Sequence, residues 1–69
     1  MNANDIVTRF TYHPPKNDQA EKYEEIRRAA RSLASLLLTL TPESREQSLA
    51  ITHLEEAVFW ANASIARNE

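Results

Sequence analysis

The stretch "YEEIRRAARSLASLLLTL", residues 23–40, decides the fold because its apolar residues recur at alternating spacings of three and four. That spacing places them in one stripe along an α-helix, the seam by which a helix packs against a partner. A helix over residues 18–40 is therefore predicted, with Asp18 and Glu21 as a capping box at its start. The stripe consists of Tyr23, Ile26, Ala30, Leu33, Leu37 and Leu40.

The segment "TPES", residues 41–44, indicates a short connection followed by a second helix. Pro42 suits a first helical position, and Ser44 with Gln47 forms a second candidate capping box. Two helices joined by so short a connection should fold back on each other, which predicts an antiparallel hairpin over residues 18–69. The second helix has a stripe with the same spacing: Ile51, Leu54, Val58, Ala61 and Ile65.

The first 17 residues have no sustained helical period, and residues 1–17 are expected to form an N-terminal arm. Pro14 and Pro15 exclude a helix there and stiffen the backbone. Next to them, Phe10 and Tyr12 place aromatic rings in the arm. Rings are costly to leave in water, so a ring on a non-helical arm either packs against a neighbour or stacks on a flat ligand.

A chain of 69 residues is long enough for one domain only, and that domain is predicted to be all-α. A domain of this size buries only about 60% of the surface that its unfolded chain exposes, so it usually needs a disulfide, a metal or a partner. Cysteine is absent, and the helices carry apolar residues beyond their seams: Leu36, Leu38, Phe59 and Trp60. A homo-oligomer is therefore expected, with Phe59 and Trp60 packing between copies.

Charge and composition limit the partners. The net charge of −2 argues against a binder of DNA or RNA polymers, which need a broad basic face. Glycine is absent, so a glycine-rich phosphate loop is excluded and any phosphate must be held by side chains or helix ends. No apolar run is long enough to span a membrane, and no signal peptide is recognisable. We expect a soluble protein of the cytoplasm.

The sequence contains no recognisable set of catalytic or metal-binding residues, so we expect neither an enzyme nor a cofactor. His53 and Glu56 lie one helical turn apart, but two ligands fall short of a metal site, and "HLEE" lacks the second histidine of a zinc-protease motif. The paired glutamates of both helices are typical of a solvated face.

The basic residues are more suggestive. Arg28 follows Glu24 by four residues, which is an ordinary helix ion pair, but Arg27 lies next to the stripe residue Ile26. A guanidinium so close to a buried edge usually has an anionic partner. Tyr12, on its stiff arm, could stack on a base, and Arg27 could bind a phosphate. Together the two residues would form a nucleotide-binding site. Duplicated across a two-fold axis, the site would suit a ligand with two bases and two phosphates.

These residues resemble the bacteriophage anti-CBASS sponge proteins over residues 9–67. The resemblance rests on Tyr12-His13-Pro14, Gln19, Ile26-Arg27 and the ending "LEEAVFWANASIAR". It implies a helical hairpin that assembles into a hexamer, binds cyclic dinucleotides such as 3',3'-cyclic GMP-AMP between protomers, and in several members holds cyclic trinucleotides in separate pockets. The implied activity is sequestration without cleavage, in the cytoplasm of the infected host, which keeps an immune effector inactive.

The family's site residues carry over to matched positions only. The stacking tyrosine matches Tyr12, and the phosphate-binding residue, commonly lysine, matches Arg27. His13 either contacts the ligand or supports the arm. The arginine of the trinucleotide pocket matches Arg67, but its polar partner falls at about Ala29, which cannot donate a hydrogen bond. That departure puts trinucleotide binding in question.

Two other functions stay open at this point. One is a helical module whose seams bind a host protein, and the other is an enzyme that degrades the messenger. The missing nucleophile–base pair and metal ligands speak against the enzyme.

Overall fold

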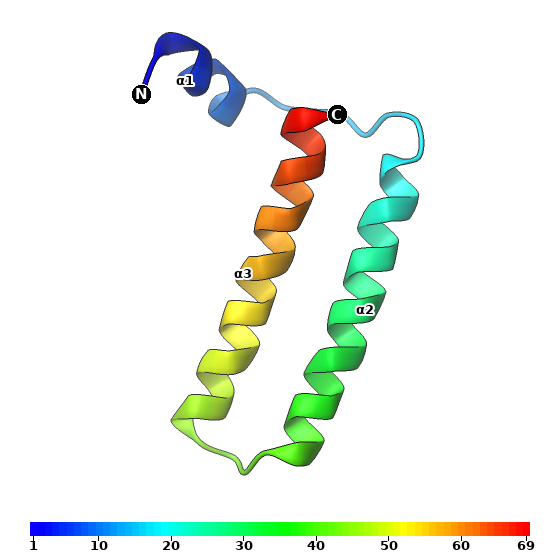
Figure 1. Cartoon of the computed structure of the whole chain (residues 1–69), viewed down its shortest axis with the longest axis vertical. Helices are drawn as coiled ribbons and strands as arrows, with labels where there is room; N and C mark the ends of the chain where they lie inside the picture. The colour runs from blue at the N-terminus through cyan, green and yellow to red at the C-terminus, as the bar shows by residue number, and fades with distance from the viewer.

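The computed structural model describes residues 1–69 and contains three helices and no strands. Helices α2 (Gln19–Leu40) and α3 (Arg45–Asn68) lie antiparallel, side by side, and are joined by residues 41–44 (Figure 1). A short helix, α1 (Ala3–Phe10), lies beyond the open end of this hairpin, near the end of α3. The predicted all-α hairpin is confirmed.

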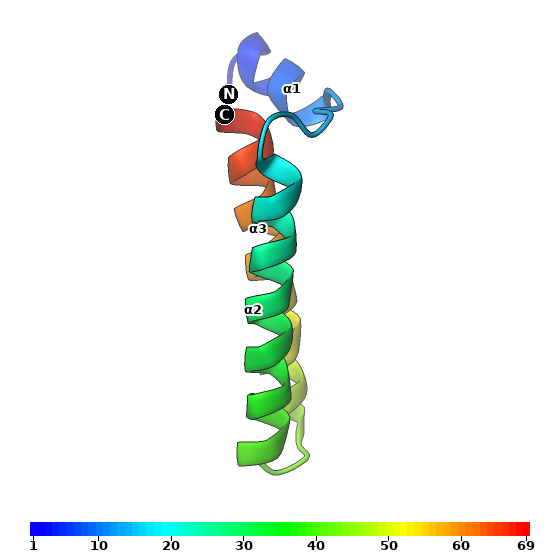
Figure 2. The same cartoon turned by 90° about the vertical axis from the view of Figure 1, so that its right-hand side faces the viewer.

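The chain is a single layer of helices. Its extents are 45 × 29 × 13 Å, and the view along the hairpin's edge shows α2 in front of α3 with nothing on either side (Figure 2). The radius of gyration is 15.2 Å, whereas a compact chain of this length would measure about 11 Å. No hydrophobic residue is buried. One layer thus supplies only part of a hydrophobic core.

The arm differs from the prediction because part of it is helical. Asn2 and Asp5 form a capping box: the Asp5 amide donates to Asn2 Oδ1 (2.9 Å), and the Asn2 amide donates to Asp5 Oδ2 (3.2 Å). This box starts α1, and the helix runs through Phe10 before Thr11 ends it in an extended conformation. The expectation that Phe10 lies in a non-helical segment is therefore wrong. Pro14 and Pro15 exclude helix only after α1 has ended.

The two predicted capping boxes have different outcomes. Ser44 is extended, and its Oγ accepts from the Gln47 amide at 3.1 Å, so it caps α3. The Gln47 side chain makes no hydrogen bond to Ser44, so the capping box is incomplete. It donates instead to the carbonyl (3.1 Å) and hydroxyl (3.0 Å) of Thr41, which links the two ends of the connection between the helices. Pro42 precedes the helix rather than occupying its first position.

Asp18 was expected to cap α2, but its side chain makes no capping hydrogen bond. Its backbone has φ −92° and ψ 13°, whereas a capping residue needs an extended backbone to aim its side chain at the helix amides. The Asp18 carboxylate instead lies 3.7 Å from Lys22 Nζ, as an exposed ion pair.

The seam of the hairpin agrees with the predicted stripes except at two positions. Residues Ile26, Leu33 and Leu40 are spaced by seven, and their exposure rises along α2: Ile26 is half-buried, Leu33 is 44% exposed and Leu40 is 70% exposed. A straight α-helix turns about 20° per seven residues away from such a repeat, so each successive residue lies further from α3. Ala34 takes the place of Leu33 in the half-buried stripe.

The caps give a first prediction. Replacing Ser44 with alanine removes the acceptor for the Gln47 amide and should lower the free energy of unfolding by about 1 kcal/mol. Asp18→Ala removes only an exposed ion pair and should cost about 0.3 kcal/mol. Urea denaturation at one fixed protein concentration measures both. Equal losses in the two variants would contradict the assignment of Ser44 as the cap.

Candidate functional site

Tyr12 lies in the non-helical segment between α1 and α2, and its side chain is 80% exposed. No hydrogen bond or ion pair involves it in this chain. An aromatic ring held in water in this way has its faces free for stacking on a flat group.

His13, next to this ring, is half-buried and braces the arm. Its Nε2 lies 2.9 Å from the carbonyl oxygen of Thr8 in the last turns of α1. This contact occupies one ring nitrogen with the backbone. Pro14 and Pro15 then lead into the turn that starts α2. The geometry therefore matches the supporting role considered for His13, with the other ring nitrogen left for further contacts.

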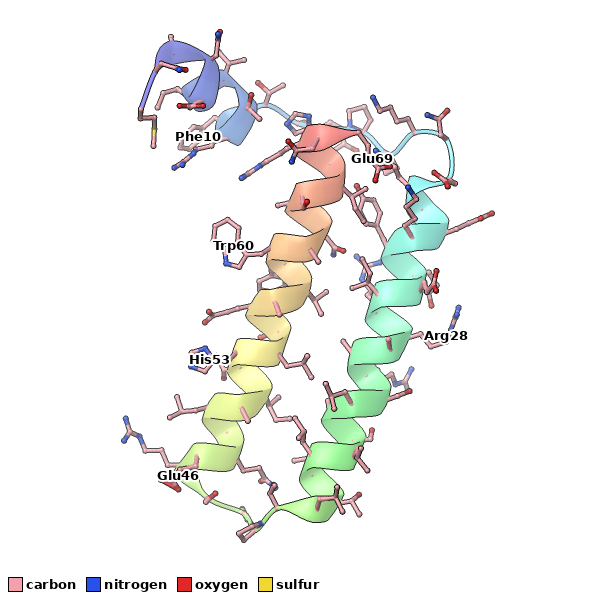
Figure 3. The ribbon with its side chains drawn as sticks, in the orientation of Figure 1. Phe10, Arg28, Glu46, His53, Trp60 and Glu69 are labelled. Atoms are coloured by element: carbon pink, nitrogen blue, oxygen red, sulfur yellow. The ribbon has the colours of Figure 1, made fainter.

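Arg27 is exposed on α2 and has no acidic partner, whereas its neighbour Arg28 pairs with Glu24 at 3.9 Å. Figure 3 shows Arg28 pointing away from α3, and Arg27, Arg28 and Arg31 border one hollow on α2 together with Glu24. The ion pairs of the chain involve neither Arg27 nor Arg31, one turn further along. These two arginines are unneutralised cations.

Arg27 and Arg31 lie at the edge of a groove between α2 and α3, with a volume of about 300 Å³. Apart from the arginines and Glu55, the lining is apolar: Ala30, Ala34, Ile51, Leu54, Val58 and Phe59. Towards the open end of the hairpin, Arg27 also borders a second hollow of about 230 Å³ with Tyr23, Asn62, Ala63 and Ala66. The Oδ1 atom of Asn62 is buried there without a hydrogen-bond partner. A cation beside apolar walls suits a ligand with both anionic and flat parts.

The structure does not join Tyr12 to Arg27 within one chain. The three main hollows that Arg27 borders are lined only by residues of α2 and α3, and none includes the arm. Each chain thus presents a free ring in one place and a free cation in another.

Arg67 borders a hollow of about 440 Å³ on α3, together with Glu56, Phe59, Trp60 and Ala63. Trp60 points away from α2, on the outer side of α3 (Figure 3), and is 68% exposed. Ala29 does not line this hollow.

His53 and Glu56 lie as the sequence suggested, with His53 Nδ1 3.8 Å from Glu56 Oε2, and both are exposed. No group of three histidine, aspartate or glutamate side chains in the chain could hold a metal ion. None of the helices is long and apolar enough to cross a membrane.

Sequence reasoning missed the role of Gln19, which is the one buried residue of the chain, at 2% exposure. Its signal was its place in the stripe: Gln19 precedes Tyr23 by four residues, so a polar side chain occupies a seam position. A buried amide at a seam needs hydrogen-bond partners, which the sequence alone did not identify.

A comparison of the sequence with protein families identifies the family of this chain. The model of the family described as "Acb2/Tad1, hairpin domain" matches residues 1–66. No curated protein and no solved structure matched the chain. The matched region contains the arm and nearly the whole hairpin. The chain therefore belongs to the Acb2/Tad1 hairpin-domain family, the family of the anti-CBASS sponges.

Proposed function

We propose that this protein binds cyclic dinucleotides, such as 3',3'-cyclic GMP-AMP, and sequesters them without cleavage, which keeps the host's CBASS defence inactive in the cytoplasm of the infected cell. The family to which the chain belongs consists of binding sponges rather than catalysts. The observation that carries the proposal is the contrast between adjacent arginines: Arg28 is neutralised by Glu24, while Arg27 is left free beside an apolar groove.

The roles of the residues follow from their chemistry. Tyr12 stacks on a base, which contributes roughly 1–3 kcal/mol. Arg27 donates two parallel N–H bonds to the oxygens of a phosphate. His13 holds the arm through its contact with Thr8 and is adjacent to the bound base. The ligand is expected to leave the site with its phosphodiester bonds intact.

The site is proposed to form between protomers of a homo-oligomer, a hexamer. A two-fold axis would bring the ring of one chain to the cation of another, and a cyclic dinucleotide has the matching two bases and two phosphates. The surface of the chain supports assembly. Its solvent-accessible surface is 5661 Å². A compact monomer of the same mass would expose less, by about 1,000 Å² or more. A standard protein interface buries about 800 Å² per partner.

The central test of the site uses a matched arginine. Tyr12→Ala and Arg27→Ala should each weaken binding of 3',3'-cyclic GMP-AMP by roughly 5- to 150-fold, because each removes about 1–3 kcal/mol of contact. Arg28→Ala, which removes an equal charge that already pairs with Glu24, should change affinity by less than about twofold. Isothermal titration calorimetry measures all three.

Binding that survives both Tyr12→Ala and Arg27→Ala would refute the site. Heating the loaded protein should return intact ligand, and recovery of a linear dinucleotide would instead support an enzyme. A protein that binds no cyclic dinucleotide but retains a host protein would support the interaction module.

Assembly and ligand count are tested together by native mass spectrometry. The expected species are multiples of the 7.9 kDa chain, a hexamer among them, with one cyclic dinucleotide per pair of chains. A shared site across a two-fold axis requires this ratio. A stable single chain, with or without ligand, would contradict the proposal.

A cyclic trinucleotide is a second candidate ligand at Arg67, which is unpaired and borders the hollow with Trp60. The resemblance places the polar partner of this arginine at about Ala29, which cannot donate a hydrogen bond, so we expect cyclic tri-adenylate to bind at least tenfold more weakly than the dinucleotide. Ala29→Ser should strengthen trinucleotide binding, and Arg67→Ala should abolish that gain. Both variants should leave dinucleotide affinity unchanged in calorimetry, and a loss there would contradict separate pockets.

A further inference from the structure

The open end of the hairpin is closed by the side chain of one residue. Gln19 is 2% exposed and makes hydrogen bonds in two directions: its Oε1 accepts from the Lys16 amide at 3.1 Å, and its Nε2 donates to the Ile65 carbonyl in a longer contact of 3.4 Å. The Gln19 amide also donates to the Lys16 carbonyl at 3.0 Å. One carboxamide therefore links the end of the arm, the start of α2 and the last turns of α3. We call this set of bonds the Gln19 latch.

The latch fixes the point from which the arm leaves the hairpin. Asn17 has φ 52°, in the left-handed region that is uncommon outside glycine but more accessible to asparagine. Such a turn persists where its surroundings hold it, and the paired bonds between Lys16 and Gln19 span it. The direction of the backbone at Lys16 is thereby set relative to both long helices.

The position of Lys16 is passed on to Tyr12 by a stiff segment. Pro14 and Pro15 lock their φ angles, so the backbone between Lys16 and Tyr12 has few soft dihedrals. The contact between His13 and Thr8 spans Tyr12 and ties the arm to α1. Tyr12 is exposed, yet the segments on both sides of it are held by hydrogen bonds.

The second residue whose position matters is Arg27, which lies eight residues beyond Gln19 on the same helix. At a rise of 1.5 Å per residue, that separation is about 12 Å along the axis of α2. Because Gln19 and Arg27 share one rigid helix, a fixed arm origin also fixes the place of the ring relative to the cation of its own chain.

A second set of contacts surrounds the latch at the surface. Lys22 Nζ donates to Glu69 Oε1 at 2.8 Å and lies near Asp18. The hydrogen bond with Glu69 raises the pKa of Lys22. These groups are exposed, so they add little to the hold of the buried amide.

We propose that Gln19 is the positioning residue of the ligand site: it does not touch the cyclic dinucleotide, but it sets where Tyr12 stands relative to Arg27 of its own chain. In a symmetric assembly this also sets the spacing between the ring of one chain and the cation of another, and so determines affinity. The inference rests on the proposed function, and it makes a separate claim about the free protein. Preorganisation raises affinity because the arm does not have to be ordered when the ligand binds.

The chain offers a matched control at the opposite end of the hairpin. Gln47 also uses its carboxamide to tie a helix start to the preceding loop, through Thr41, and it lies far along the hairpin from the arm. Gln19→Met and Gln47→Met each keep the length of the side chain while removing its hydrogen bonds. Both should lower thermal stability.

Two measurements on the full-length assembly separate positioning from stability. In the ligand-free protein, ¹⁵N relaxation should show the order parameter of Tyr12 falling from about 0.85 towards about 0.6 in Gln19→Met, and staying near its original value in Gln47→Met. With 3',3'-cyclic GMP-AMP, Gln19→Met should bind roughly tenfold more weakly and Gln47→Met within about twofold of the parent.

Equal losses of affinity in the two variants, or an unchanged order parameter in Gln19→Met, would overturn the inference. If Gln19→Met does not fold, Gln19→Glu takes its place: the carboxylate still accepts from Lys16 but cannot donate to Ile65, and it should loosen Tyr12 in the same direction. If the parent protein binds no cyclic dinucleotide, the proposed function fails, while the order parameter of Tyr12 still decides the role of Gln19.

Discussion

A single layer of two helices cannot bury an apolar side chain, and this constraint governs the rest of the molecule. Each helix has a neighbour on one side only, so even the seam residues of the hairpin remain half-buried, and Trp60 and Phe59 remain in water. The chain therefore lacks the core from which an ordinary domain obtains its free energy of folding, which supports the proposal that copies of it assemble. The same lack of thickness leaves no room for an enclosed pocket within one chain. Assembly and binding are therefore expected to use the same surfaces.

Within this constraint, the distribution of charge supports the proposed binding site. The chain has a net charge of −2, so its acidic groups outnumber its basic ones. Arg28 and Lys22 nevertheless pair with acids, whereas Arg27 and Arg31 lie unpaired along one groove. A local pair of cations in an acidic protein favours a small anion over a polymer, because a polymer would meet repulsion beyond the site. The charge of the groove is thus compatible with the small anionic ligand proposed from the family of the chain.

The features that could be predicted from the sequence are those that depend on local spacing. The two long helices, the hairpin and the cap at Ser44 follow from apolar periodicity and from residue preferences at helix ends. Helix α1 was missed because its capping box, Asn2 with Asp5, uses a less common pair and because the prolines that follow suggested a longer non-helical arm. Leu33 and Leu40 were misplaced because a seven-residue repeat drifts around a straight helix. Gln19 could be seen in the stripe, but its bond to Ile65 joins residues 46 apart in the sequence and depends on how the two helices pack. The separation of Tyr12 from Arg27 within one chain could not be predicted either, because it depends on where the arm lies relative to the hairpin.

The short connection at residues 41–44 has a kinetic consequence. Every contact between the long helices can form by zipping outward from that turn, so a newly made chain should reach its hairpin quickly, in the manner of helical proteins with low contact order. If the chains assemble as proposed, their encounter would be the slow, concentration-dependent step. In the proposed assembly, the number of complete ligand sites would rise more steeply than the amount of protein made. Dilute hairpins would remain unassembled and would lack the site shared between chains.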